Sequence, residues 1–152
     1  MKPTPLRTSA LALAAAQTAI VTPLFPAFAN TEKSWDLLRS IEVDEITAGT
    51  TYKVRKIFPA AIQDGVEQFD ITGYVVLLWS DENVSDFMLI SDMGFCPFCG
   101  NPEHGTSLEV RLSAPVASLA DGDRLTVRGA LELVRDPETT QSARLTKAKI
   151  LR

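Results

Sequence analysis

Hydrophobic and polar residues alternate along most of the chain beyond residue 50, in short runs that turn signals separate. Runs rich in β-branched and aromatic residues predict strands, and clusters of Gly, Pro, Asn and Asp predict the turns between them. The predicted strands are 51–58, 69–79, 87–90, 107–112, 124–133 and 143–151. The clearest predicted turns are 80–83, 121–123 and 136–138. This pattern is typical of a small all-β domain.

Residues 31–47 follow a different spacing. Their apolar positions lie near a period of 3.6 residues with acidic residues between them, which predicts a helical or irregular segment. These positions are Trp35, Leu37, Leu38, Ile41 and Ile46. The segment 30–49 is therefore expected to precede the β domain.

Two of the predicted strands carry a glycine in the middle, Gly73 and Gly129. Glycines at such positions allow a small barrel to coil tightly, and Gly73 suggests a bulge or a tight bend. We therefore expect an OB-like five-stranded Greek-key barrel, all-β with a small helical addition, over residues 50–152. A β-sandwich is the alternative.

Residues 1–29 have the features of a cleaved signal peptide. Lys2 and Arg7 supply a positive start, an apolar stretch rich in Ala and Leu follows, and Ala27-Phe28-Ala29 forms a small-x-small cleavage pattern. Prolines and threonines interrupt the apolar stretch, so its uninterrupted part is shorter than the roughly 20 residues that a membrane-spanning helix needs. The pattern predicts an exported, periplasmic protein that is soluble after cleavage.

The length of 152 residues fits one folded domain, and the formal net charge is −4. Removal of residues 1–29 takes away two basic residues and no acidic one, which leaves a charge of −6. An acidic chain without a basic patch argues against a nucleic-acid partner, because phosphate backbones are bound by clustered Lys and Arg.

The segment 93–105 holds both cysteines and the only histidine of the chain: Cys96, Cys99 and His104. A Cys-x-x-Cys turn lets two thiolates reach one ion, and His104 follows closely enough to supply a neutral imidazole nitrogen. A closed structural zinc site needs a fourth ligand, so water, Asp92, Glu103 or a partner would have to complete it. We therefore predict a metal site at these three residues, with zinc favoured and Cu(I) also suited to such soft ligands.

Two alternatives for the same segment stay open. An exported chain can oxidise Cys96 and Cys99 to a disulfide, in which case Phe95 and Phe98 would flank a stiffened loop that docks on another envelope protein. A thiol–disulfide oxidoreductase is less favoured, because Gly100 and Pro102 oppose the helix that lowers the pKa of the first thiol in thioredoxin-type motifs.

Motifs for hydrolytic chemistry are missing from the sequence. It contains no Gly-x-Ser-x-Gly, no His-Glu-x-x-His and no glycine-rich phosphate loop, so we do not expect an enzyme. Trp79, Tyr74 and Phe87 could line a ligand face of the barrel, but packing in the core is the favoured role for all three.

The chain resembles the bacterial exported proteins grouped as domain of unknown function 3299. The resemblance covers about residues 50–152, and it rests on the following segments in order: Phe58-Pro59, Ile71 to Leu77, Asp86 to Ile90, Cys96-Pro97-Phe98-Cys99, Glu109 to Leu112 and Val127 to Leu131. Members of this family are often found with ABC-type transport components, some of them linked to zinc supply. The resemblance therefore implies an accessory role beside a membrane transport system, while the ligand set Cys96, Cys99 and His104 comes from the residues alone.

Overall fold

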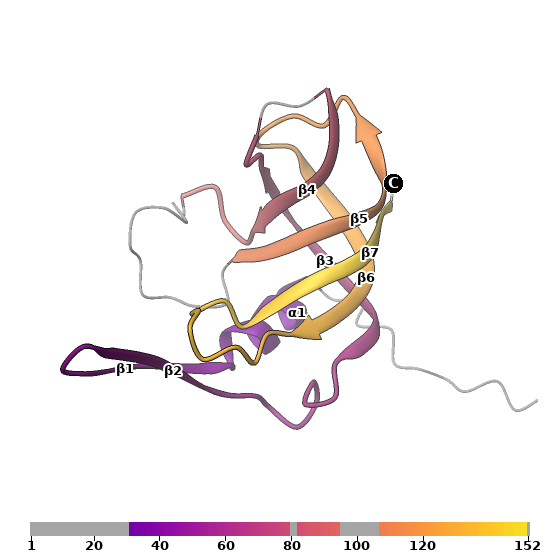
Figure 1. Cartoon of the computed structure of the whole chain (residues 1–152). Helices are drawn as coiled ribbons and strands as arrows, with labels where there is room; N and C mark the ends of the chain where they lie inside the picture. The colour runs from indigo at the N-terminus through magenta and orange to yellow at the C-terminus, as the bar shows by residue number, and fades with distance from the viewer. Residues whose placement is uncertain (1–30, 80–81, 95–106, 152) are drawn as a thin grey trace, which may run out of the picture.

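The computed structural model describes residues 31–79, 82–94 and 107–151. These residues form one helix and two β-sheets (Figure 1). The elements are α1 (Thr31–Arg39), β1 (Glu42–Ala48), β2 (Thr51–Ile57), β3 (Val66–Val76), β4 (Asn83–Ile90), β5 (Ser107–Ala117), β6 (Arg124–Leu133) and β7 (Ala143–Leu151). The predicted signal peptide, residues 1–29, and the predicted metal ligands Cys96, Cys99 and His104 lie outside the described residues.

Five strands close into a barrel in the order β3-β4-β5-β7-β6. β5 and β7 pair in parallel, and every other neighbouring pair in the barrel is antiparallel. Each of the five strands pairs with two others, although β3 and β4 pair only where residues 74–76 face residues 88–90. The prediction of an all-β, OB-like small barrel is confirmed.

The barrel interior is filled by alternate residues of each strand. Along β3 the buried positions are Phe69, Ile71, Gly73 and Val75, while the residues between them are partly exposed. The other strands contribute inward side chains with the same period of two, which is the pattern expected when one face of a sheet is buried. The largest fully buried side chains of the barrel strands are Phe69, Ile71, Phe87, Leu89, Leu108, Leu131 and Leu145.

Gly73 and Gly129 lie where two backbones approach closely. A Cβ atom on Gly73 would lie 2.5 Å from the Ile90 carbonyl oxygen, and one on Gly129 would lie 2.6 Å from the Thr146 carbonyl oxygen. Gly129 faces a bulge in β7, where Lys147 has a φ of 51° and the register with β6 shifts. In β3 the register shift falls between Val66 and Phe69, so Gly73 permits close packing and does not form a bulge.

The hairpin of β1 and β2 corrects two predictions from the sequence. Residues 42–47 belong to a strand and are not helical, and the predicted strand 51–58 pairs with β1 outside the barrel. Gly49, with a φ of 61°, begins the two-residue connection, and a type II′ hairpin turn requires glycine there. Only Val54 of β2 is buried, so this strand lacks the apolar face that a barrel strand needs.

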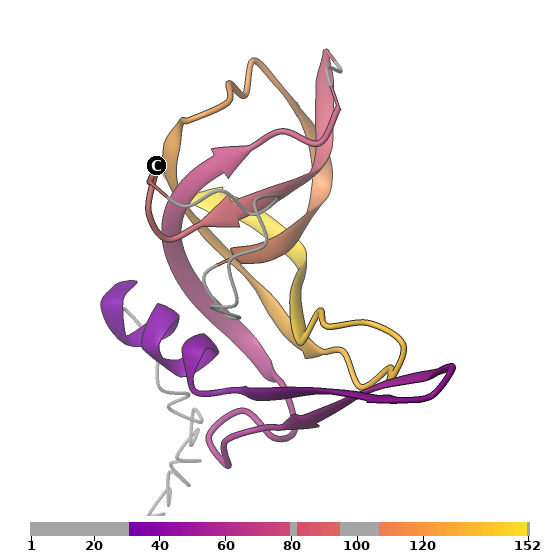
Figure 2. The same cartoon turned by 90° about the vertical axis from the view of Figure 1, so that its left-hand side faces the viewer.

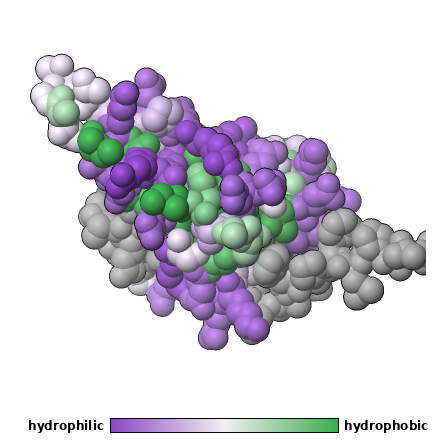
Figure 3. Space-filling view, turned by 90° about the horizontal axis from the view of Figure 1, so that it is seen from below, coloured by the Kyte–Doolittle hydropathy of each residue, from purple (hydrophilic) through white to green (hydrophobic). Residues whose placement is uncertain are grey.

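The hairpin extends away from the barrel, as Figures 1 and 2 both show. Its large apolar side chains are isolated: Ile46, Tyr52 and Ile57 are each between 42% and 50% exposed. Seen from below, apolar side chains of the described residues appear as separate spots among hydrophilic ones (Figure 3). Scattered apolar residues of this kind are ordinary on a protein surface.

Helix α1 packs beside β3, as Figure 2 shows. The Trp35 Nε1–H donates to the Thr72 carbonyl oxygen at 2.7 Å, and the Ser34 hydroxyl donates to the Asp70 carbonyl oxygen at 2.8 Å. β4 pairs with β3 only at residues 74–76, so these carbonyl groups belong to a stretch of β3 that extends past β4. The helix thus satisfies backbone acceptors that the barrel leaves without a strand neighbour.

Candidate functional site

The sequence-predicted metal ligands Cys96, Cys99 and His104 all fall in residues 95–106, outside the described residues. The ends of the connection that contains them are described. Ile90 at the end of β4 and Ser107 at the start of β5 are register partners, so the chain leaves and returns at neighbouring positions. On the β4 side, the Gly94 N–H donates to Asp92 Oδ1 at 2.6 Å.

Within residues 31–79, 82–94 and 107–151, no three His, Cys, Asp or Glu side chains gather as a metal-binding group. The predicted metal site therefore stays a prediction from the sequence.

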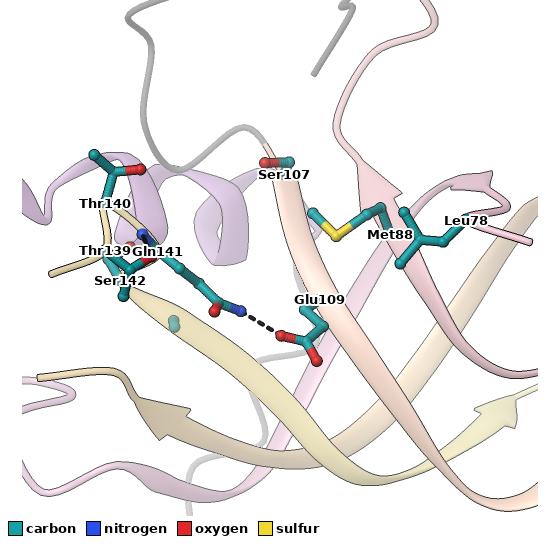
Figure 4. Close-up of a pocket in the computed structure, with 9 residues that line it drawn as sticks. Leu78, Met88, Ser107, Glu109, Thr139, Thr140, Gln141 and Ser142 are labelled. Carbon is teal, nitrogen blue, oxygen red and sulfur yellow. Dashed lines mark hydrogen bonds between the residues drawn. The ribbon is translucent and has the colours of Figure 1, made fainter. Parts of the chain in front are cut away.

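A hollow of about 380 Å³ lies on the outer side of the barrel, between β4, β5 and the connection from β6 to β7. Figure 4 shows Met88 from β4, Ser107 and Glu109 from β5, and Thr139 to Ser142 from the connection. Gln141 Nε2 donates to Glu109 Oε2, which joins the connection to the face of β5. Polar and apolar atoms contribute about equally to the lining of this hollow, and its apolar side chains are Leu78, Met88 and Ala143.

A second hollow of about 560 Å³ adjoins the first, because Leu78 and Glu109 line both. Its other lining residues include Trp79, Asn83, Ser85, Asp86 and Arg111. Trp79 is 73% exposed, more than any other large apolar side chain of the described residues. We call the two hollows together the β4–β5 groove.

The charged groups of the β4–β5 groove are paired with one another. Arg111 Nε donates to Glu109 Oε1 at 2.7 Å and lies 3.6 Å from Asp86 Oδ1. Asp86 and Arg111 are register partners on β4 and β5, and Glu109 is the register partner of Arg144 on β7. The charged lining groups of the groove are two carboxylates and one guanidinium, a net charge of −1. The hydrogen bonds from Arg111 and Gln141 hold the Glu109 carboxylate in one orientation.

Glu109 is the most enclosed acid of this network, with its side chain 17% exposed. Burial alone raises the pKa of a carboxyl group, but the hydrogen bonds from Gln141 and Arg111 outweigh burial and hold the pKa of Glu109 below its ordinary value. Glu109 is therefore a charged acceptor at neutral pH, and its contacts with Arg111 raise the pKa of that guanidinium.

Lys56, on β2 of the hairpin, holds the connection from β6 to β7 in place. The Lys56 ammonium donates to three carbonyl oxygens of that connection or its start: Val134 at 3.0 Å, Asp136 at 2.8 Å and Gln141 at 2.6 Å. Burial lowers the pKa of Lys56, while the nearby Asp136 carboxylate acts in the opposite direction. The hairpin thus positions Gln141 and its neighbours at the wall of the groove.

The opposite wall is fixed where β3 ends. Asp121 Oδ1 accepts the Leu77 N–H at 2.9 Å, and the Val75 backbone exchanges hydrogen bonds with Gly122 and Asp123. These contacts hold the turn 121–123 against the end of β3. The chain then leaves the sheet, which places Leu78 and Trp79 at the groove.

The hypothesis that Tyr74, Trp79 and Phe87 all pack in the core is wrong for two of them. Phe87 is fully buried, but Tyr74 is partly exposed with the Arg124 guanidinium 6.0 Å from its ring centre, and Trp79 is largely exposed.

Sequence reasoning did not single out Glu109 or Gln141 as site residues. The outward position of Glu109 between Leu108 and Val110 was a usable signal, whereas the approach of Gln141 depends on tertiary structure.

The enclosed position of Glu109 predicts a pH dependence of stability. Its pKa is lower in the folded protein than in the unfolded chain, so its contribution is complete above its ordinary pKa of about 4.3 and is lost as the pH falls through the folded value. We expect the free energy of unfolding of Glu109→Gln to fall less than that of the parent protein between about pH 5 and pH 3. Urea unfolding at stepped pH measures this, with the exposed Glu138→Gln as control. The prediction would be contradicted if the free energy of unfolding fell equally with pH in the parent protein and in Glu109→Gln.

Comparison of the chain with protein-family models, with curated proteins and with solved structures finds no match. The resemblance to domain of unknown function 3299 therefore stays a prediction. In the described part of the chain, no helix has the length and apolar character needed to cross a membrane.

Proposed function

We propose that this chain is an exported, periplasmic, non-enzymatic protein that binds a transition metal, zinc first, through Cys96, Cys99 and His104. The observation that carries the proposal is the concentration of both cysteines and the only histidine in one connection between β4 and β5. The pairing of Ile90 with Ser107 supports it, because a loop with joined ends loses less conformational entropy when its side chains gather around one ion.

The chemistry of the three residues fits a metal that prefers soft and borderline ligands. Two thiolates and one imidazole supply three positions of a tetrahedral zinc site, and water, Asp92, Glu103 or a partner supplies the fourth. Binding displaces the thiol protons, so affinity falls as the pH is lowered. In the role implied by the family resemblance, the protein works beside membrane transport components.

The test is native mass spectrometry of the full chain, expressed for export and purified from the periplasmic fraction without added metal. We expect a reduced chain that carries one zinc ion, which a chelator removes. Cys96→Ser and Cys99→Ser should each abolish this zinc binding, because loss of either one leaves the site with a single thiolate ligand. Met93→Leu, a change in the same connection that removes no ligand, should leave it intact.

Two results would overturn the metal proposal. One is unchanged zinc binding in both cysteine variants. The other is a metal-free parent chain whose mass is lower by the two thiol hydrogens, which means a Cys96–Cys99 disulfide. That second result would favour the alternative, a disulfide-stiffened module that docks on an envelope protein through Phe95 and Phe98.

A further inference from the structure

We propose that the β4–β5 groove is a binding site for a neutral, polyhydroxylated chain, that is, an oligosaccharide. The site stands apart from the proposed metal function, because none of the residues that carry it is a predicted metal ligand. Three features of the described residues support it: an exposed indole at one end, planar polar groups along the floor, and lining charges that sum to −1, without a positive excess.

Trp79 provides the stacking surface. It is 73% exposed at the rim of the larger hollow, beside Asn83 and Ser85. An indole combines a large apolar face with a polar N–H, so it gains most from a ligand that presents an apolar face and polar edges together. The C–H face of a pyranose ring with its surrounding hydroxyl groups has that composition.

The groove floor provides hydrogen-bond partners suited to hydroxyl groups. The floor carries four planar polar groups: Glu109, Arg111, Asp86 and Gln141. Hydrogen bonds from Arg111 and Gln141 orient the Glu109 carboxylate before any ligand arrives, and Asp86 lies 3.6 Å from Arg111. Preorganised groups lose little conformational entropy on binding, which favours weakly binding polar ligands. Ser107 and Thr140 add hydroxyl groups to the lining of the smaller hollow.

Charge separates this ligand class from nucleic acids. In barrels of this type, the face of the second and third strands and the flanking loops can bind either oligonucleotides or oligosaccharides. In this chain those strands are β4 and β5, and among their described residues Arg111 is the one arginine that lines the groove; it contacts Glu109 and faces Asp86. A phosphate chain needs unpaired positive charge, which the described lining of the groove does not offer.

The floor of the groove presents side chains to a ligand. β5 pairs with β4 on one side and with β7 on the other, whereas β4 pairs with β5 along Asn83–Ile90 and with β3 only at Met88–Ile90. A peptide that binds by strand addition needs a free sheet edge, which the floor on β5 does not offer. A ligand therefore contacts side chains, and the two adjoining hollows of about 380 and 560 Å³ lie within the size range of small-molecule sites.

The test is isothermal titration of the full-length protein with three neutral hexasaccharides: cellohexaose, maltohexaose and the β-1,4-linked hexamer of N-acetylglucosamine. We expect at least one to bind with a Kd of about 1 mM or tighter. Trp79→Ala should weaken this binding at least about tenfold, since the stacking surface is lost. Glu109→Gln, which keeps the shape of the side chain and removes its charge, should weaken it by a smaller factor.

The matched control is Tyr52→Ala, which removes an exposed aromatic ring from the hairpin, away from the groove, and should leave binding unchanged. Circular dichroism checks that each variant is folded; Trp79 is exposed, so its removal spares the core. The proposal is overturned if none of the three hexasaccharides binds, if Trp79→Ala binds as well as the parent, or if a dT hexamer binds more tightly than every saccharide. Zinc binding by the same preparations tests the proposed function separately.

Discussion

Replacement of Gly73 by Ala is expected to destabilise the barrel strongly, although it adds only one methyl group. The new Cβ would lie 2.5 Å from the Ile90 carbonyl oxygen, 2.8 Å from Leu89 Cγ and 3.1 Å from a ring carbon of Trp35. The Ile90 carbonyl is a backbone group and Leu89 is fully buried, so neither can move away easily. β3 and β4 would therefore have to separate to make room for the methyl group. Overpacking of a tight core costs about 1–3 kcal/mol or more.

The opposing effect is smaller. Ala restricts the unfolded chain more than Gly does, which stabilises a strand position by roughly 0.5–1 kcal/mol. The clash therefore dominates, and we expect the free energy of unfolding to fall by about 2 kcal/mol. Urea unfolding followed by circular dichroism measures it. Gly94→Ala is the control, since its nearest neighbour is the side-chain carboxylate of Asp92 at 3.2 Å; equal stability of the two variants would refute the close-approach explanation.

The barrel strands were predictable because each of them shows the alternation of apolar and polar residues in its own sequence. The buried face of each barrel strand repeats every second residue, and the predicted strands 124–133 and 143–151 coincide with β6 and β7. The hairpin was not predictable in the same way. Glu42–Ala48 is exposed at nearly every position, so its few apolar residues carry no period of two, and Ile41 and Ile46 fit a helical spacing by coincidence. Its strand conformation comes from pairing with β2 across the turn at Gly49.

The groove was only partly predictable. Its strands and the outward position of Glu109 follow from alternation, but Trp79 lies at the end of a dense apolar run that favours burial. Trp79 is exposed because β3 ends at Val76: the Leu77 N–H donates to the Asp121 carboxylate and not to a neighbouring strand. Gln141 reaches Glu109 because Lys56, far away in sequence, holds the β6–β7 connection. Contacts between distant segments of this kind leave no local pattern in the sequence.

Both proposals place function on the same pair of strands. The connection with Cys96, Cys99 and His104 starts after Ile90 and returns at Ser107, and Ser107 also lines the smaller hollow. The variants that test them do not overlap: the cysteines are changed in one case, and Trp79 and Glu109 in the other. Loss of zinc binding with saccharide binding retained, or the reverse, would therefore assign each activity to its own residues.

Trp35→Ala is the substitution with the largest expected loss of stability. Trp35 is 3% exposed and lies in the core cluster, and its Nε1–H donates to the Thr72 carbonyl oxygen at 2.7 Å. Removal of a buried tryptophan side chain costs about 3–5 kcal/mol. Folded domains have a total stability of roughly 5–15 kcal/mol, so the variant should lose between about a fifth and all of its stability.

The loss of stability in Trp35→Ala should extend beyond the helix to the whole barrel. Helix α1 has nine residues, too few to be stable without tertiary contacts, and Trp35 is one of its two side chains that hydrogen-bond to β3. Because the indole also covers Gly73 and the start of the β3–β4 contact, we expect the whole barrel to lose stability in one transition, measured by urea unfolding and by amide exchange across β3. Trp35→Phe, which keeps most of the apolar contact and loses the hydrogen bond, should cost about 1–2 kcal/mol. Exchange that increases in α1 alone would show that the helix covers the barrel without stabilising it.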